Sequence, residues 1–335
     1  MHCPMHTYFY TSGFLIVNID EIQTFLAIAE LGGFTRAGRR LHRSQPAISR
    51  RLGLLEQELG APMFERIHGR ARLTEAGLAF LPHAEAALAA LRDGREAVAG
   101  LASGMGGTIS LALVGTLADT RIIDALRRFA RRFKDVRLEL RTASSREVTD
   151  LVRRGEAILG LRYFASERPE LVSVDAGGEA MLVVAAAGHR LAGRHIREAR
   201  LLAGERWIGF PPTPGERDSS GHVLARQLIR AGLDAGDITL IDSLTAQKRL
   251  AEAGFGLALV PESSVAEELR RGSLVALDVP GMRTTIPITA IHRRKGYLGP
   301  TTKALLSLLT GGMAQAKARR AGTRGGASSG RSPSR

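Results

Sequence analysis

The chain has 335 residues, of which 44% are hydrophobic and 24% charged, a composition typical of a globular protein with two or three domains. It carries 47 Lys and Arg against 33 Asp and Glu, and this net charge of +14 favours nucleic acid or another anionic surface as a partner. The single cysteine, Cys3, excludes a disulfide framework and a cysteine-based zinc site, and is typical of a reducing compartment. Aromatic residues make up only 5%, which argues against binding single strands by base stacking.

No membrane or export segment is predicted. The longest apolar-rich run near the start, residues 8–17, is about half the ~20 residues that a spanning helix needs. No Lys or Arg precedes this run, whereas a signal peptide begins with a basic region. We therefore expect a cytoplasmic protein without a membrane partner, in which residues 1–16 form a disordered extension.

Two stretches hold positive charge without any acid. Residues 34–53 contain six arginines, and residues 311–335 contain six Lys and Arg. The second stretch is rich in Gly, Ser and Ala and cannot bury enough surface to offset chain entropy, so we expect a disordered basic tail. Such a tail is either solvated and inert or an electrostatic arm that contacts DNA without sequence preference.

The N-terminal block, residues 17–75, begins with two predicted helices. Apolar residues recur at helical spacing over residues 20–31, and a pair of glycines ends this helix. Thr35 is well suited to cap a short helix that ends at Leu41.

A third helix is predicted after a three-residue turn. Ser44 is expected to cap it, Pro46 lies in its first turn, and Gly60 stops it. Its buried stripe steps by four, three and four residues through Ile48, Leu52, Leu55 and Leu59. Helix, three-residue turn and helix is the helix-turn-helix pattern, whose second helix reads base edges in the major groove of double-stranded DNA.

The exposed side of this third helix offers side chains for base recognition. Gln45 and Ser49 form one row, and Pro46 and Arg50 form the adjacent row. Gln pairs bidentately with adenine and Arg with guanine. A solvated amphipathic helix is the alternative, which the acid-free arginine run beside a capped turn disfavours.

A small hairpin is predicted next. Gly69 separates two short extended pieces, and Arg66, Arg70 and Arg72 on them would form a basic wing that faces the DNA backbone.

A long helix rich in Ala and Leu follows, capped by Thr74 and expected to kink at Pro82. Over residues 76–103 it carries a heptad seam, which predicts a dimerising coiled coil; the alternative is a helix packed on its own domain. The seam residues are Leu81, Ala84, Leu88, Leu91, Arg95 and Val98.

Four segments between residues 34 and 77 form a specific signature: residues 34–37 (FTRA), 41–50 (LHRSQPAISR), 54–66 (LLEQELGAPMFER) and 72–77 (RLTEAG). On these segments the chain resembles the LysR-type family of transcriptional regulators. It departs at Arg43, where the family has an apolar residue, and at Gly38, where alanine is usual; the glycine should weaken the short helix by ~1 kcal/mol. The residues expected to contact DNA are Thr35, Arg36, Arg43, Ser44, Gln45, Pro46, Ser49, Arg50, Arg51, Arg66, Arg70 and Arg72.

Beyond Gly107, predicted strands and helices alternate. The strands are expected at residues 108–114, 136–140, 157–161, 181–185, 207–210, 237–241 and 256–260. The helices between them are expected at residues 120–133, 145–154, 221–231 and 244–253. The alternation predicts a parallel α/β sheet in two units joined by a crossing strand, with a ligand cleft beyond the carboxyl ends of the strands.

The resemblance extends more weakly into this half, at residues 107–116, 154–156 and 253–261. It implies the family's co-inducer-binding region, similar to the two-lobed periplasmic binding proteins. Lobe I is then expected from residues 107–165 and 286–310, with a return strand at 287–291 and a last helix at 301–309, and lobe II from residues 166–285. Ile158 stands where the family has aspartate, which leaves the polar contacts of the crossover open.

Candidate effector-binding residues lie at predicted strand ends and helix starts. Hydroxyls and free N–H groups at helix starts favour a carboxylate or other anion, and Arg162 would reinforce that preference. The alternative is that the Ser and Thr residues merely cap helices. The candidates are Thr116, Leu117, Thr142, Ser144, Leu161, Arg162, Phe210, Pro211, Thr213, Ser243, Thr245 and Pro261.

An enzyme is the main rival class. The glycines at 104–107 precede a strand instead of following one, and no Gly-x-Ser-x-Gly elbow is present. His2, Cys3 and His6 could hold a metal, but they fall in the expected disordered extension, and we predict no catalytic residue, metal or cofactor. A solute-binding receptor without DNA activity would need export and leaves the arginine-rich turn unexplained.

The sequence thus predicts an α/β protein with an N-terminal winged helix-turn-helix, a long dimerising linker helix and a two-lobed α/β effector domain similar to periplasmic binding proteins. Its expected function is that of a LysR-type regulator of transcription, in which a small molecule between the lobes changes how the oligomer sits on a pseudo-palindromic promoter site. The resemblance implies a homodimer that assembles into a homotetramer, and leaves RNA polymerase open as a further partner.

Overall fold

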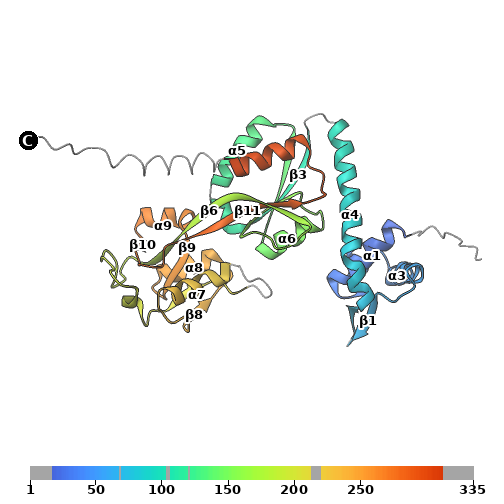
Figure 1. The fold of residues 1–335 in the computed structure, drawn as a ribbon. Coiled ribbons are helices and arrows are strands. Elements are labelled where there is room, and N and C mark those ends of the chain that lie inside the picture. The colour runs from blue at the N-terminus through green and yellow to red at the C-terminus, as the bar shows by residue number, and fades with distance from the viewer. Residues whose placement is uncertain (1–16, 68, 103–105, 120, 213–219, 312–335) are drawn as a thin grey trace, which may run out of the picture. The chain divides into compact units, whose positions relative to one another are not determined.

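The computed structural model describes residues 17–67, 69–102, 106–119, 121–212 and 220–311 (Figure 1). Three predictions fall on residues outside these ranges: the N-terminal extension with Cys3, the basic tail beyond residue 311, and the candidate effector-binding residue Thr213. The chain divides into two compact units, Met1–Leu91 and Arg92–Arg335, and each has a hydrophobic core of its own.

The N-terminal unit is a winged helix-turn-helix. Its elements are α1 (Ile19–Leu31), α2 (Phe34–Arg40), α3 (Gln45–Leu59), the antiparallel pair β1 (Phe64–Ile67) and β2 (Arg70–Leu73), and the first part of α4 (Glu75–Ala102). The predicted stripe of α3 is confirmed: Ile48 and Leu55 are fully buried and Leu52 nearly so. They pack around Phe25, whose ring centroid lies 5.4 Å from that of Phe64 and 5.2 Å from that of Phe80.

The turn between α2 and α3 differs in detail from the prediction. Thr35 does not cap α2, because the helix begins at Phe34 and Gly33, in an extended conformation, takes the N-cap position. Ser44 does occupy the N-cap of α3, but its side chain makes no capping hydrogen bond. The turn passes so close to α2 at Gly38 that a larger residue would clash with it. An added Cβ there would lie 2.7 Å from the carbonyl oxygen of Arg43.

The start of α4 is fixed as predicted. Thr74 Oγ1 accepts a hydrogen bond from the backbone N–H of Gly77 at 3.0 Å and donates one to the carbonyl of Pro62 at 2.6 Å. At Gly77 an added Cβ would lie 2.2 Å from the carbonyl oxygen of Met63, so α4 packs backbone to backbone against the loop before the wing.

The predicted heptad seam of α4 is partly buried and partly exposed. Ala84 and Leu88 are buried in the core of their own N-terminal unit, as the alternative to a coiled coil required. Leu91 and Val98, one heptad apart, are 46% and 67% exposed. Only part of the seam therefore remains open for a partner helix. The helix also continues through Pro82 without interruption.

The C-terminal unit is built on one mixed sheet whose strand order is β4-β3-β5-β11-β6-β9-β7-β8, with β10 paired to β6. Lobe I contributes β3 (Gly107–Val114), β4 (Val136–Ala143) and β5 (Leu159–Tyr163). Lobe II contributes β7 (Trp207–Gly209), β8 (Ile238–Leu240), β9 (Leu257–Pro261) and β10 (Leu274–Leu277). Within each lobe the neighbours β3–β4, β3–β5, β7–β8 and β7–β9 are parallel, as expected of an α/β unit.

Two long strands cross between the lobes, and the second of them contains the return strand predicted at residues 287–291. β6 (Leu171–Ala186) leads from lobe I to lobe II, and β11 (Thr284–Arg293) brings the chain back. They pair antiparallel along the length of β11, with a register shift between Ile288 and Thr289. The predicted parallel pairing therefore holds within the lobes but not at the centre of the sheet, because a strand that leaves and a strand that returns run in opposite directions.

Helices cover this sheet (Figure 1). Lobe I has α5 (Arg121–Arg132), α6 (Ser145–Arg153) and a last helix over residues 300–311; lobe II has α7 (Ser220–Arg230), α8 (Leu244–Glu252) and the short α9 (Ala266–Arg271). Short 3₁₀ turns η1 (Gly115–Asp119), η2 (Ala199–Leu202) and η3 (Glu262–Val265) complete the unit. The sequence did not predict α9, β10 or these turns.

Candidate functional site

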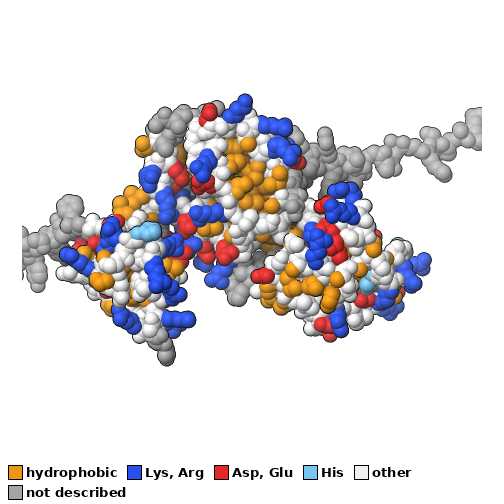
Figure 2. All heavy atoms as spheres, turned by 180° about the vertical axis from the view of Figure 1, so that it is seen from behind, with side chains coloured by type: hydrophobic (Ala, Val, Ile, Leu, Met, Phe, Trp, Pro, Cys, Tyr) orange, Lys and Arg blue, Asp and Glu red, His pale blue; other side chains and the backbone are white. Residues whose placement is uncertain are grey.

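The N-terminal part of α3 presents a polar face to solvent. Gln45, Pro46 and Arg50 are exposed and Ser49 is half-buried, on the side opposite Ile48 and Leu52. Within the described residues neither Gln45 nor Arg50 is engaged in a hydrogen bond or an ion pair. Figure 2 shows Lys and Arg side chains gathered on the N-terminal unit. The side chains of Gln45 and Arg50 are therefore available to an anionic partner.

Other arginines of the predicted set support the fold. Arg51 donates to Asp20 on α1 at 2.5 Å. The guanidinium of Arg66 stacks over the ring of Phe34, 5.1 Å from its centroid. The side chain of Arg36 lies against the turn at Gly33. The structure therefore separates this set into side chains that are free and side chains that are already engaged.

The wing does not present its three arginines together. Because side chains alternate along a strand, Arg70 and Arg72 share one face of the hairpin, and the register places Glu65 opposite Arg72. Arg66 pairs with Ala71 and belongs to the other face. Only Arg70 and Arg72 therefore form a common basic face of the hairpin. Arg43, in the turn before α3, is a further exposed basic residue.

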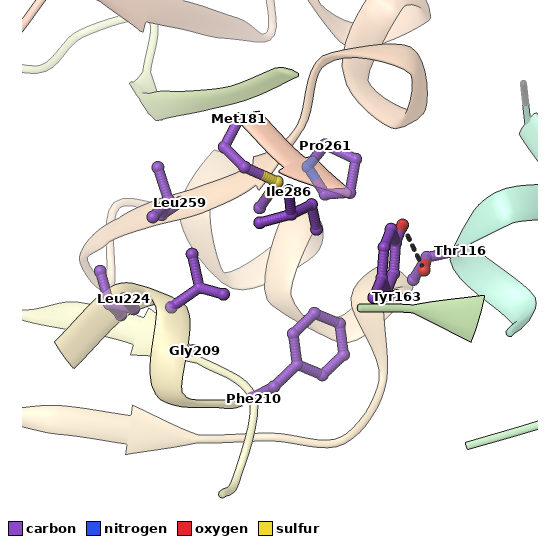
Figure 3. Close-up of a pocket in the computed structure, with 10 residues that line it drawn as sticks. Thr116, Tyr163, Met181, Gly209, Phe210, Leu224, Leu259, Pro261 and Ile286 are labelled. Carbon is purple, nitrogen blue, oxygen red and sulfur yellow. Dashed lines mark hydrogen bonds between the residues drawn. The ribbon is translucent and has the colours of Figure 1, made fainter. Parts of the chain in front are cut away.

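A second candidate site is a pocket of the C-terminal unit at the crossing strands (Figure 3). Its cavity volume is small, about 10 Å³. Its lining is mainly apolar and draws on both lobes and on both crossing strands. The lining residues are Thr116, Tyr163, Met181, Gly209, Phe210, Val223, Leu224, Leu259, Pro261 and Ile286.

The pocket has a polar end and an apolar end. Thr116, on the turn after β3, and Tyr163, at the end of β5, share a hydrogen bond of 2.9 Å between their hydroxyl oxygens (Figure 3). Leu224 of α7 and Leu259 of β9 lie at the opposite end in the same view. Phe210 presents its ring between the two ends. Such a lining suits a small molecule with an apolar body and one polar group.

Three of the predicted effector contacts line this pocket: Thr116, Phe210 and Pro261. Leu117 and Leu161 are fully buried in the core of the unit. They do not belong to the pocket lining.

Arg162 also lies away from the pocket. Its guanidinium is buried and donates to the carbonyl of Tyr163 at 3.1 Å and to Thr149 Oγ1 at 2.7 Å. Successive residues of a strand point to opposite faces, so Arg162 is directed to the side of α6 while Tyr163 faces the pocket. The expectation that Arg162 reinforces an anion site has no support in this arrangement.

The remaining candidates lie at helix starts and loops. Ser144 caps α6 through a hydrogen bond from the backbone of Glu147, and Ser243 caps α8 through one from Ala246. Thr142, Pro211 and Thr245 are exposed. Capping, the alternative considered for these hydroxyls, thus accounts for Ser144 and Ser243.

Sequence reasoning missed most of the apolar lining. Tyr163 follows Leu161 by two residues in one strand, and Met181 and Ile286 lie on the crossing strands at alternating positions. The alternation of side chains along a strand was the available signal, but which face of each strand lines the pocket depends on pairing between strands distant in sequence.

Neither metal chemistry nor a membrane span is indicated by the part of the chain that the structure describes. It holds no cluster of three His, Cys, Asp or Glu side chains able to bind a metal ion. No helix in it is long and apolar enough to cross a bilayer.

A winged helix-turn-helix with a free polar recognition face, followed by a two-lobed unit with a pocket at the crossing strands, defines a ligand-responsive transcriptional regulator. Family comparison agrees in both halves. Residues 19–78 match the bacterial regulatory helix-turn-helix proteins of the lysR family, and residues 102–314 match the LysR substrate binding domain. The chain therefore belongs to the LysR family and is a DNA-binding transcriptional regulator with an effector-binding domain.

Individual relatives cover nearly the whole chain. The HTH-type transcriptional regulator IlvR of Caulobacter vibrioides is 31% identical over 88% of this chain and 98% of its own length. ClcR of Pseudomonas putida is 26% identical over 86% of this chain and 97% of its own. Among solved structures, the LysR family regulator CbnR superposes with a TM-score of 0.61 at 25% identity, over 87% of this chain and 98% of CbnR.

Proposed function

We propose that the N-terminal part of α3 reads base edges in the major groove of a double-stranded promoter. The observation that supports this most strongly is the contrast between its two faces: Ile48 and Leu55 are fully buried, whereas Gln45 and Arg50 are exposed and unengaged within the described residues. Gln and Arg are the side chains that pair bidentately with adenine and guanine. A structure of CbnR with its target DNA provides a precedent at 25% identity.

The remaining basic side chains would hold the DNA backbone. Arg43 in the turn and Arg70 and Arg72 on one face of the wing are exposed, so each can meet a phosphate, and the affinity they supply falls as salt rises. Thr35, Arg36, Ser44, Pro46 and Ser49 surround the recognition surface and belong to the proposed contact set. Arg51 and Arg66 are proposed to support the contacts indirectly, through their partners in the fold.

The working unit is proposed to be a dimer, or a tetramer made of two dimers. Leu91 and Val98 remain exposed on α4 one heptad apart, which suits the a or d positions of a helix pair. Two recognition helices related by a two-fold axis would require a pseudo-palindromic site with half-sites one helical turn, or a multiple of it, apart. RNA polymerase is proposed as a further partner of such an assembly on a promoter.

The effector is proposed to bind in the pocket between the lobes. Since the lining comes from lobe I, lobe II and both crossing strands, a bound molecule has different contacts in an open and in a closed arrangement. A ligand shifts such an equilibrium in proportion to its preference for one arrangement. That shift would change how the oligomer sits on its promoter.

The chain is proposed to act as a regulator and not as a catalyst, since the matched relatives are named as transcriptional regulators. Because its partner is the bacterial promoter, we place it in the cytoplasm. We retain the domain division proposed from sequence: residues 17–75 for DNA binding, 76–103 for the linker, 107–165 with 286–310 for lobe I, and 166–285 for lobe II.

Fluorescence anisotropy with the intergenic DNA next to the protein's own gene tests this function. Gln45→Ala should lower affinity for the specific duplex by about 1–3 kcal/mol while its affinity for a scrambled duplex stays the same. Gln57→Ala, at an exposed position near the other end of α3, is the matched control and should change neither. Equal affinity of the wild type for both duplexes would contradict sequence-specific binding.

A further inference from the structure

An acidic side chain on β6 neighbours two of the residues that line the pocket. Glu179 lies on β6 and is only 7% exposed. Side chains two residues apart on a strand share a face, so Glu179 shares its face with Met181. It is also paired across the sheet with Ile286. Both neighbours line the pocket.

The turn after β9 completes the surroundings of this carboxylate. Met181 pairs with Pro261, so the next position on the same face beside Glu179 belongs to Ser263. The backbone N–H of Ser263 donates to Glu179 Oε1 at 3.1 Å. The turn η3, which contains Ser263, lies against η1, which carries Thr116. Glu179 therefore lies toward the polar end of the pocket, with the hydroxyls of Thr116 and Tyr163.

The carboxylate of Glu179 has few hydrogen-bond partners among the described residues. An ionised carboxylate offers about four acceptor positions. Among the described residues, Glu179 receives the single bond from Ser263 and has no basic side chain as a partner. The Ser263 hydroxyl oxygen is itself buried without a hydrogen-bond partner. Buried acids are normally paired or fully hydrogen-bonded, whereas the second carboxylate oxygen of Glu179 receives no hydrogen bond from a described residue.

We propose that the missing donor is supplied by the effector, and that the effector is a small molecule with a protonated amine and a branched or aromatic apolar body. The amine would face Glu179, and the body would lie between Phe210, Leu224 and Leu259. This inference rests on the proposed effector pocket and names the class of molecule that the pocket takes. It replaces the anion expected from the sequence, because Arg162 is engaged with Thr149 and no described lining residue is a cation.

A matched series of probes tests the charge of the ligand. The full-length protein is titrated with 3-methylbutylamine, 3-methylbutanol and 3-methylbutanoate, which share one apolar body and differ at the polar end. Binding is measured by calorimetry and by ligand-detected NMR. The amine is expected to bind about ten- to hundredfold more tightly than the alcohol and the carboxylate, as hydrogen bonds to a charged group imply.

The variant Glu179→Gln tests whether the charge of Glu179 causes the preference for the amine. The substitution keeps the shape and removes the charge, so it should abolish the preference for the amine and leave the affinity for the alcohol unchanged. Glu167→Gln, an exposed glutamate of the same unit, is the matched control and should bind all three probes as the wild type does. Thermal unfolding shows whether Glu179→Gln is folded; if it is not, Glu179→Asp keeps the charge and should retain a weaker preference for the amine.

Three results would overturn the proposal: tighter binding of the carboxylate or the alcohol by the wild type, a preference for the amine that survives Glu179→Gln, or no saturable binding of the amine. Promoter affinity is measured on the same samples. If the wild type binds its promoter but does not prefer the amine, only the effector class is wrong. If the wild type does not bind the promoter specifically, the proposed function fails independently of the ligand.

Discussion

Arg51 on the recognition helix α3 and Asp20 at the start of α1 form an ion pair, with 2.5 Å between Nη2 and Oδ2. Arg51 has 24% of its side chain exposed and Asp20 has 59%. The neighbouring Arg50 is exposed and has no such partner within the described residues. Two adjacent arginines of one helix therefore have different tasks: Arg51 holds the helix to α1, and Arg50 is free for DNA.

This difference predicts opposite phenotypes for two alanine variants. Arg50→Ala should weaken specific DNA binding by about 1–3 kcal/mol and leave the melting temperature unchanged. Arg51→Ala should lower the stability of the N-terminal unit by up to about 1 kcal/mol, as surface ion pairs do. Anisotropy and thermal unfolding of both variants are the measurements. If both variants are fully folded and lower DNA affinity equally, the different roles of Arg50 and Arg51 are contradicted.

Gly77 should tolerate no side chain. A Cβ there would lie 2.2 Å from the carbonyl oxygen of Met63 and 2.9 Å from Leu73 Cδ2, so Gly77→Ala should destabilise the N-terminal unit by about 1–3 kcal/mol. The control is Gly53→Ala on α3, where nothing lies within 4 Å of the added atom. That change should raise stability by about 0.5–1 kcal/mol, because alanine favours the helix. Urea denaturation followed by circular dichroism compares the two.

The capping role of Ser144 predicts a stability effect with a defined pH dependence. The backbone N–H of Ser144 donates to Glu147, and this bond, with a second from the Ser144 side chain, holds the pKa of Glu147 below its ordinary value of 4.5. The contribution of the ionised carboxylate is therefore present above pH 4.5 and is lost as the pH falls through the lowered folded-state pKa. Ser144→Ala should cost about 1 kcal/mol at pH 7.

Urea midpoints measured between pH 7 and pH 3 check this pair. The difference between the wild type and Glu147→Gln should be largest above pH 4.5 and should shrink in acid. Ser145→Ala, one position along the same helix, serves as the control and should not reproduce the loss. A constant difference across the whole range would show that ionised Glu147 does not supply the stability.

The hydrogen bond between Thr116 and Tyr163 should be needed for binding of the effector and not for binding of DNA. Thr116→Val keeps the volume and removes the hydroxyl, so the pocket would lose part of its polar end. The stabilisation that 3-methylbutylamine gives in a thermal-shift experiment should decrease, while promoter affinity stays the same. Thr142→Val, at an exposed position of β4, should behave as the wild type. Loss of promoter affinity in Thr116→Val would indicate misfolding and not a ligand effect.

Local patterns predicted the N-terminal unit well. The stripe of Ile48, Leu52 and Leu55, the glycine stop at Gly60 and the cap at Thr74 all follow from spacing and residue type, because each is decided by contacts a few residues away. The exception at Thr35 has the same cause: an extended Gly33 competes for the cap, and local preference does not separate the two positions.

The pocket was harder to predict because its residues meet only through the sheet. Arg162 and Tyr163 are adjacent in sequence but face opposite sides of β5, and nothing local says which side is the pocket. The return strand β11 pairs with β5 and β6, and the paired residues are more than a hundred positions apart in sequence. Glu179 could be placed beside Ile286 only once that register was known.

The position of β11 also has a consequence for synthesis. The core of the N-terminal unit is made from residues that leave the ribosome first, so the DNA-binding head can fold while the rest of the chain is still being made. The strand between β5 and β6 in the sheet is supplied by Thr284–Arg293, near the end of translation. A chain that stops before Thr284 would therefore have a finished head and an effector sheet open at its middle. A nonsense mutation that falls after the codons of the N-terminal unit and before the codon of Thr284 is thus predicted to yield a fragment that occupies promoters without answering to any metabolite.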